Sequence, residues 1–78
     1  MLQGNGQWMF LILGVRVHAR NLPINNMAVA HRYNEAVRSI VEPICRGRGH
    51  WDPEYKNWVI FDQFREIVLE ELGRLERQ

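Results

Sequence analysis

Apolar and basic positions alternate from residue 15 to residue 20, in the order Val-Arg-Val-His-Ala-Arg. A period of two is typical of a β-strand with one face on the core and the other in water. The continuous apolar run of residues 8–13 precedes it. We expect the same strand to begin there, with both faces covered and a bulge at Gly14. Pro23 ends it, because proline has no N–H to donate to a sheet.

Apolar residues then recur at intervals of three and four, which places them on one face of a helix. They are Ala30, Tyr33, Val37, Ile40, Val41 and Ile44. We expect this helix over residues 27–41, with Asn25 or Asn26 as its N-cap. Pro43 should end it near Val41, because the residue before a proline avoids the helical conformation.

The C-terminal part of the chain predicts a β-hairpin followed by a second helix. Asp52 and Pro53 are typical of the first two positions of a type I turn, so residues 49–52 and 58–61 are expected to be strands joined by residues 53–57. Asp62 is expected to cap a helix over residues 63–76. Its apolar stripe consists of Phe64, Ile67, Val68, Leu72 and Leu75.

The predicted order is β-α-β-β-α, which indicates an α+β fold. Two helices with one apolar stripe each fit a two-layer sandwich, in which they cover one face of a three-stranded antiparallel-type sheet. A chain of 78 residues is long enough for one domain. We expect that domain over residues 9–78, with residues 1–8 as a flexible lead because Gly4-Asn5-Gly6 gives the backbone high freedom.

A lone cysteine and a short apolar run bear on the cellular setting. Cys45 is the only cysteine, so no disulfide forms within the chain, and a reducing, cytoplasmic compartment is expected. The run of residues 8–13 is too short to cross a membrane. A domain this small also needs tight aromatic packing or self-association to be stable, and we expect a homodimer or larger homo-oligomer.

The positive charge is concentrated in the first fifty residues, which contain six arginines and two glutamates. Residues 51–78 contain four basic and seven acidic side chains. Arginine is well suited to bind phosphate and to stack on bases, so the excess favours a nucleic-acid partner. A GC-rich genome would also favour arginine over lysine.

The segment from Trp51 to Phe61, WDPEYKNWVIF, resembles the signature of the HARP domain, a small module that flanks the motor of annealing helicases. It shares the aromatic residue followed by Asp-Pro, the short turn with a basic residue, the second Trp and the apolar residues before a helix. It is also similar to related small domains found beside primases and other mobile-element proteins. The resemblance covers the layout of residues 15–75. It implies a role in DNA transactions through recognition of DNA structure rather than base sequence.

The candidate nucleic-acid-binding residues combine cations with exposed aromatic rings. Arginines follow a phosphate backbone, while aromatic faces stack on unpaired bases. The candidates are Arg16, Arg20, Arg46, Arg48, Trp51, Tyr55 and Lys56. These groups also have plainer interpretations. Arg16 and Arg20 would lie on a solvated strand face, Arg46 and Arg48 would belong to a flexible connector, and Trp51 would be an indole that a small core requires. The expected partner is single-stranded or branched DNA.

A protein-interaction module is the alternative function, either as a homo-oligomer or as a mobile-element-encoded inhibitor that docks on a host protein. Trp8, Phe10 and Ile12 are its candidate oligomer interface, because an uncovered apolar strand invites pairing with a second chain. We expect no enzyme activity, small-molecule substrate, cofactor or metal. The chain has neither the ligand spacing of a zinc site nor a phosphate-binding glycine motif.

Overall fold

One antiparallel sheet and two helices form the computed structural model, which describes residues 2–78. The strands are β1 (Leu2–Gly4), β2 (Gln7–Ile12), β3 (Val15–Asn21), β4 (Met27–His31), β5 (Gly49–Asp52) and β6 (Asn57–Ile60). The helices are α1 (Glu35–Cys45) and α2 (Arg65–Glu76), and short 3-10 turns occupy Pro23–Asn25 and Asp62–Phe64. The strand order is β1-β2-β3-β4-β6-β5, and every neighbouring pair is antiparallel.

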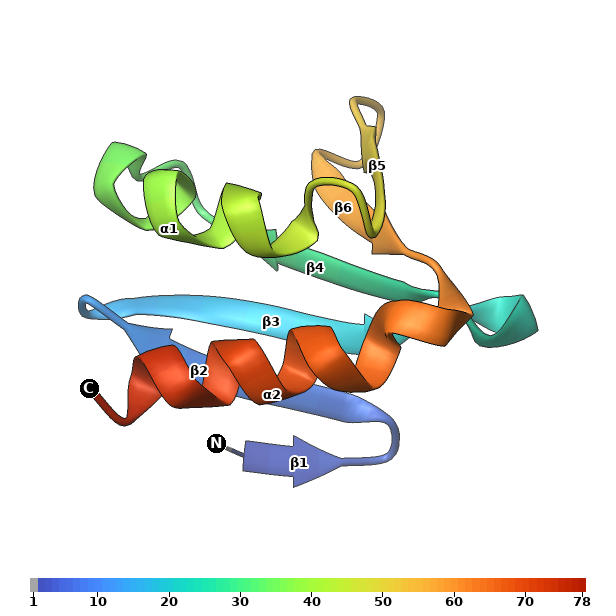
Figure 1. Ribbon diagram of the computed structural model, residues 1–78, viewed down its shortest axis with the longest axis horizontal. Helices are drawn as coiled ribbons and strands as arrows, with labels where there is room; N and C mark the ends of the chain where they lie inside the picture. Colours follow the sequence, from blue (N-terminus) through green and yellow to red (C-terminus); the bar gives the residue numbers. More distant parts are fainter. Residues whose placement is uncertain (1) are drawn as a thin grey trace.

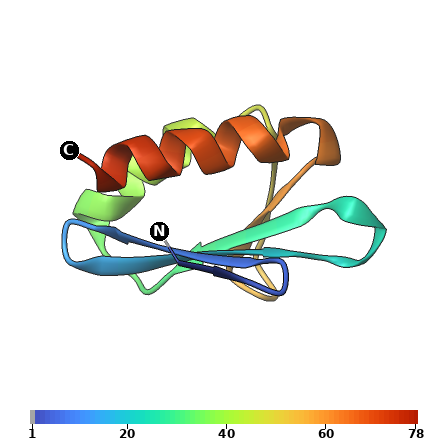
Figure 2. The same cartoon turned by 90° about the horizontal axis from the view of Figure 1, so that it is seen from below.

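The molecule has two layers. Both helices lie on one face of the sheet, and no described element covers the other face (Figure 2). Helix α2 runs along β2 and β3, while α1 lies on the β4 side (Figure 1). The predicted α+β class is confirmed. The predicted three strands are wrong, because the sheet contains five strands of four or more residues and the three-residue edge strand β1.

Two tight hairpin turns explain the extra strands at the N-terminus. Asn5 and Gly6 have φ values of 54° and 75°, and Leu13 and Gly14 have φ values of 50° and 75°. Positive φ at both central residues is typical of the type I′ turn, whose twist matches that of the flanking strands. Gly14 is therefore a turn residue rather than a bulge. The strand expected over residues 8–20 is instead divided between β2 and β3.

The expected flexible lead of residues 1–8 contains regular structure. Residues 2–4 form β1, whose Gly4 pairs with Gln7 across the first turn. Residues 7 and 8 begin β2, and Met1 lies outside the described residues. The single sheet therefore extends almost to the start of the sequence.

The first helix begins eight residues later than expected. Met27 to His31 form β4, a central strand between β3 and β6. Asn34, rather than Asn25 or Asn26, is the N-cap of α1, because its Oδ1 accepts a hydrogen bond of 3.0 Å from the N–H of Val37. β4 has a strand on each side, β3 and β6, and Met27, Ala28 and Val29 are all exposed to 3% or less.

Pro43 does not end α1, which continues to Cys45. Proline removes one backbone hydrogen bond, at a cost of roughly 3 kcal/mol within a helix. The continuation is favoured because the Cys45 side chain is fully buried in the core. The N–H of Arg46 then closes the last turn with a bond of 2.8 Å to the carbonyl oxygen of Glu42.

The C-terminal hairpin is formed as predicted, within one residue at the second strand. Asp52 stabilises the turn, because its Oδ1 accepts hydrogen bonds from the N–H groups of Glu54 (2.9 Å) and Tyr55 (3.4 Å). The prediction that Asp62 caps the last helix is wrong. Asp62 begins a 3-10 turn and pairs with Arg65 at 3.3 Å, and α2 starts at Arg65 with no side-chain cap.

Alternate residues of the sheet build the core beneath the helices. The fully or almost fully buried apolar residues include Phe10, Ile12, Val15, Val17, Ala19, Met27, Val29 and Ile60 from the strands. Val37, Val41 and Cys45 contribute from α1, and Val68 and Leu72 contribute from α2. Because strand side chains alternate between faces, the residues between these positions lie on the opposite, uncovered face of the sheet.

Candidate nucleic-acid interface

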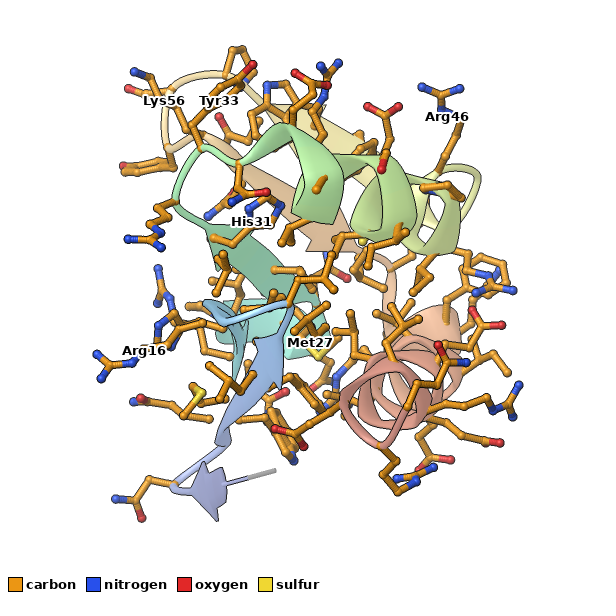
Figure 3. All side chains as sticks on the ribbon, turned by 90° about the vertical axis from the view of Figure 1, so that its left-hand side faces the viewer. Arg16, Met27, His31, Tyr33, Arg46 and Lys56 are labelled. Carbon is orange, nitrogen blue, oxygen red and sulfur yellow. The ribbon has the colours of Figure 1, made fainter. Side chains whose placement is uncertain are left out.

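The uncovered face of the sheet carries a row of basic side chains along β3. In β3, buried Val15, Val17 and Ala19 alternate with exposed residues at positions 16, 18 and 20. Arg16, His18 and Arg20 therefore project away from both helices, and Figure 3 shows Arg16 in this orientation. We call this surface, together with Arg32, the open face.

The neighbours of this row are small or flexible. On the β4 side, His18 pairs with Ala30 and Arg20 pairs with Ala28. On the β2 side, the partner of His18 is Met9, and the partner of Arg16 is Leu11. Alanine side chains are too short to shield the adjacent guanidinium groups. The centre of the open face is therefore accessible to a ligand as broad as a nucleic-acid backbone.

Arg32 adds a further cation at one end of the row. β3 and β4 are antiparallel, and Val17 pairs with His31. Moving one residue along each strand from this pair brings Arg16 opposite Arg32. Arg16, His18 and Arg32 line a shallow hollow of about 430 Å³ together with Gly14. No carboxylate lines this hollow.

The open-face arginines lack the carboxylate partners that most of the other arginines have; among residues 2–78, Arg77 at the end of α2 is the other arginine that forms no such pair. Within residues 2–78, carboxylates pair with five arginines: Arg38, Arg46, Arg48, Arg65 and Arg74. Arg16, Arg20 and Arg32 form no such pair with any described residue. Their charge is therefore directed to solvent or to a partner.

The loop arginines predicted to belong to the same interface lie elsewhere. Arg46 pairs with Glu42 on α1 at 2.7 Å and is exposed on the helix side. Arg48 pairs with Glu71 of α2 and also donates to the carbonyl oxygen of Ile44 at 3.2 Å. Its partly buried guanidinium thus connects the end of α1 to α2, which is a structural role.

Trp51, one of the two aromatic candidates of the hairpin, faces the helix side of the sheet. Trp51 pairs with Trp58, and Trp58 pairs with the core residue Val29, so both indoles project toward the α1 layer. Trp51 and Lys56 line a groove beside α1, whereas Tyr55 is 71% exposed at the turn. The structure thus divides the predicted nucleic-acid residues between two faces.

The candidate oligomer interface is largely buried within the chain. Phe10 and Ile12 are covered to 98% or more, and Trp8 packs against the same core. Phe10 and Ile12 lie in the core, where α2 covers this side of β2 (Figure 1). Within the apolar run of residues 8–13, the exposed large residues are instead Leu11 and Leu13, at 50% and 68%.

Arg32 is the open-face residue that the sequence analysis missed. The sequence pattern predicts a helix at this position, whereas Arg32 directly follows β4. Had residues 27–31 been recognised as a strand, antiparallel pairing with β3 would have placed Arg32 beside Arg16. The signal was the uninterrupted run from Met27 to Ala30.

Cys45 has the properties of a core residue. Burial raises the pKa of its thiol to about 12, and the nearby charge of Arg48 only partly opposes this. Such a thiol is almost entirely protonated and is a poor nucleophile. Among the described residues, no group of three or more His, Cys, Asp or Glu side chains is arranged to hold a metal ion.

No helix within residues 2–78 is both long and apolar enough to span a membrane. In comparisons with known proteins, no family model matches the chain. No curated protein matches it either, and no solved structure does. The function is therefore inferred from the chain's own geometry.

Proposed function

We propose that the chain is a small, non-enzymatic module that binds nucleic acid through phosphate contacts on the open face. The observation that carries the proposal is the group of Arg16, Arg20 and Arg32 on an uncovered sheet face, without carboxylate partners among the described residues. Like charges directly across two strands destabilise a sheet. A bound phosphate between Arg16 and Arg32 would remove that repulsion.

The spacing of the row supports a backbone ligand. Residues on the same face of a strand repeat every two positions, or about 6.8 Å. This repeat is close to the separation of successive phosphates along an extended nucleic-acid strand. Arg16 and Arg20 can therefore contact different phosphates, with His18 between them.

The surroundings support recognition of structure rather than base sequence. Ala28 and Ala30, beside the row, offer no polar side-chain group to a base edge. Contacts to phosphate position a protein on nucleic acid but carry no sequence information by themselves. The likeness of residues 51–61 to the HARP signature supports the same proposal, and single-stranded or branched DNA is the proposed ligand.

Fluorescence anisotropy with a labelled single strand and a labelled fork tests this function. The open-face variant combines Arg16→Gln with Arg32→Gln. The control variant combines Arg74→Gln with Arg77→Gln, which removes the same charge from exposed positions at the C-terminal end of α2. Each phosphate contact that forms on a single strand releases about 0.7 counterion, so the open-face variant, which lacks two contacts, should bind between about tenfold and a hundredfold more weakly at about 50 mM salt.

The control variant should retain affinity within about threefold, because long-range charge is its only contribution. Thermal melting of both variants checks that they fold. Equal losses in the two variants would indicate that net charge alone drives binding. The absence of wild-type binding at about 50 mM salt would remove the proposal.

Protein interaction is the second candidate function, and the exposed Leu11 and Leu13 favour it. Leu11 pairs with Arg16, so this apolar patch adjoins the basic row. A two-fold dimer centred on the row would bring the same arginines together, which disfavours self-association there. Light scattering on wild-type and Leu11→Gln protein tests this candidate. A dimer that the substitution dissociates would favour it over nucleic-acid binding.

A further inference from the structure

A groove lies on the helix side of the sheet, between α1 and the β5–β6 hairpin. Its volume is about 600 Å³, which is within the range of small-molecule sites. Val29 lies at its base and is fully buried. None of the basic side chains of the open face (Arg16, His18, Arg20 and Arg32) lines it, although Ala30, beside that row, does.

Two indoles form an aromatic corner in this groove. The rings of Trp51 and Trp58 are 5.7 Å apart between centroids and inclined at 71°. Trp51 is 48% exposed, so part of its ring is available for stacking. A flat ligand that stacks on one indole would meet the other ring at a steep angle. This arrangement favours a planar aromatic ligand over an aliphatic one.

His31 supplies a hydrogen-bond acceptor to the groove. Its Nδ1 lies 2.7 Å from the carbonyl oxygen of Arg32. A carbonyl oxygen only accepts hydrogen bonds, so this geometry assigns the proton to Nδ1. In the neutral ring, Nε2 is then an acceptor. His31 lines the groove and can accept a hydrogen bond from an amino group of a base.

The charged side chains of the groove favour an anion. Arg38, Arg46 and Lys56 line it, together with a single carboxylate, that of Glu42. Both arginines already pair with this carboxylate, at 3.6 Å for Arg38 and 2.7 Å for Arg46. Lys56 forms no ion pair with any residue in the described range, and it is exposed.

The cations lie at the edge of the groove. Figure 3 shows Lys56 near Tyr33 and Arg46 farther along α1. The hydroxyl of Tyr33 donates to Glu35 at 2.6 Å, and this hydrogen bond orients a third aromatic ring that lines the groove. The aromatic corner and the cationic edge together match a ligand with a flat apolar part and a negative charge.

We propose that this groove binds a nucleotide, with the base stacked on Trp51 and the phosphate beside Lys56. A base carrying a phosphate can come from a free mononucleotide or from the end of a nucleic-acid strand. The proposal is independent of the open face, because different residues carry it. An aromatic side chain of a peptide would fill the corner but would not use the cationic edge.

Titration of the ¹⁵N-labelled full chain with adenosine monophosphate tests the proposal by NMR. The indole N–H signals of Trp51 and Trp58 should shift saturably, and that of Trp8 should stay in place. Adenosine should bind several-fold more weakly, and inorganic phosphate should leave the indole signals unchanged. A 5′-phosphorylated oligonucleotide that binds more tightly than the mononucleotide would identify a strand end as the source, and the reverse order would identify a free nucleotide.

Matched variants assign the contacts. Trp51→Ala should weaken binding by between about fivefold and a hundredfold, the range expected for loss of one stacked base. The control Tyr55→Ala removes an exposed ring of the same hairpin that does not line the groove, and it should change affinity by less than about twofold. Lys56→Gln should lower the affinity for the monophosphate to that for adenosine and leave adenosine binding unchanged.

Three results would overturn the proposal. The first is the absence of saturable shifts at millimolar adenosine monophosphate. The second is tighter binding of N-acetyltryptophanamide, which would indicate a site for aromatic peptides. The third is an unchanged monophosphate affinity in Lys56→Gln. The open-face variant should retain mononucleotide binding, so the two proposals succeed or fail separately.

Discussion

Replacing Gly49 with alanine should disrupt the packing of β5 against β6. A methyl group at Gly49 would lie 2.0 Å from the carbonyl oxygen of Val59 and 2.8 Å from Cα of Ile60. Both atoms belong to the backbone of the paired strand, so no side-chain rotation relieves the clash. The strands would have to separate near the Gly49–Ile60 pair.

The expected loss of stability can be compared with a matched control. Overpacking of this kind costs roughly 1–3 kcal/mol and occasionally more, partly offset by about 0.4–1 kcal/mol from the reduced entropy of the unfolded chain. At Gly4, which has no atom within 4 Å of the added methyl group, only the entropic gain remains. Gly49→Ala should therefore destabilise the fold, whereas Gly4→Ala should be neutral or slightly stabilising.

Urea unfolding, followed by circular dichroism and tryptophan fluorescence, measures the difference. With a slope of about 1 kcal/mol per molar urea for a domain of this size, the midpoint of Gly49→Ala should fall by about 1–2 M. The midpoint of Gly4→Ala should equal or exceed that of the wild type. If Gly49→Ala unfolds at the wild-type urea concentration, the close approach of β5 and β6 is refuted.

Three further predictions concern the core and α1. Phe10→Ala should cost about 3–5 kcal/mol, because Phe10 is fully buried and lies beside Gly73; a melting temperature within a few degrees of wild type would contradict this. Asn34→Ala should cost about 1 kcal/mol through loss of its hydrogen bond to Val37, whereas Asn34→Asp should retain most of the stability in urea unfolding. Cys45, whose pKa is raised to about 12 by burial, should react with a thiol reagent only in denaturant, and rapid labelling of the folded protein would show that the thiol is accessible.

Local turn chemistry explains which parts of the fold were predictable. The β5–β6 hairpin was found because Asp52 and Pro53 specify a turn through short-range hydrogen bonding and a fixed φ. The Asn5-Gly6 turn carries an equally strong signal, but it was interpreted as flexibility. Leu13 adopts a positive φ, which is unusual for an apolar residue, so the second turn lay hidden within a continuous apolar run.

Long-range packing decided the rest of the fold. The run Met27–Ala30 suits a helix or a strand, and short apolar runs do not distinguish the two by period. Its place between β3 and β6 is set by residues distant in sequence. Pro43 lies within α1 for a related reason, since burial of Cys45 depends on the sheet beneath it.

The candidate site was predictable where strand alternation alone places a residue. Arg16 and Arg20 were located correctly on one face of β3 for that reason. Arg48, in the loop after α1, was not, because its partner Glu71 is 23 residues away in α2. The groove was not predicted, because it depends on how far α1 stands from the β5–β6 hairpin.

The salt dependence of DNA affinity tests the central claim most directly. Each phosphate contact on a single strand contributes about 0.7 to the slope of log K against log salt concentration. Combining Arg16→Gln with Arg32→Gln should therefore reduce that slope by about 1.4, while Arg74→Gln with Arg77→Gln leaves it nearly unchanged. Identical slopes for wild type and the open-face variant would show that these arginines do not contact phosphate.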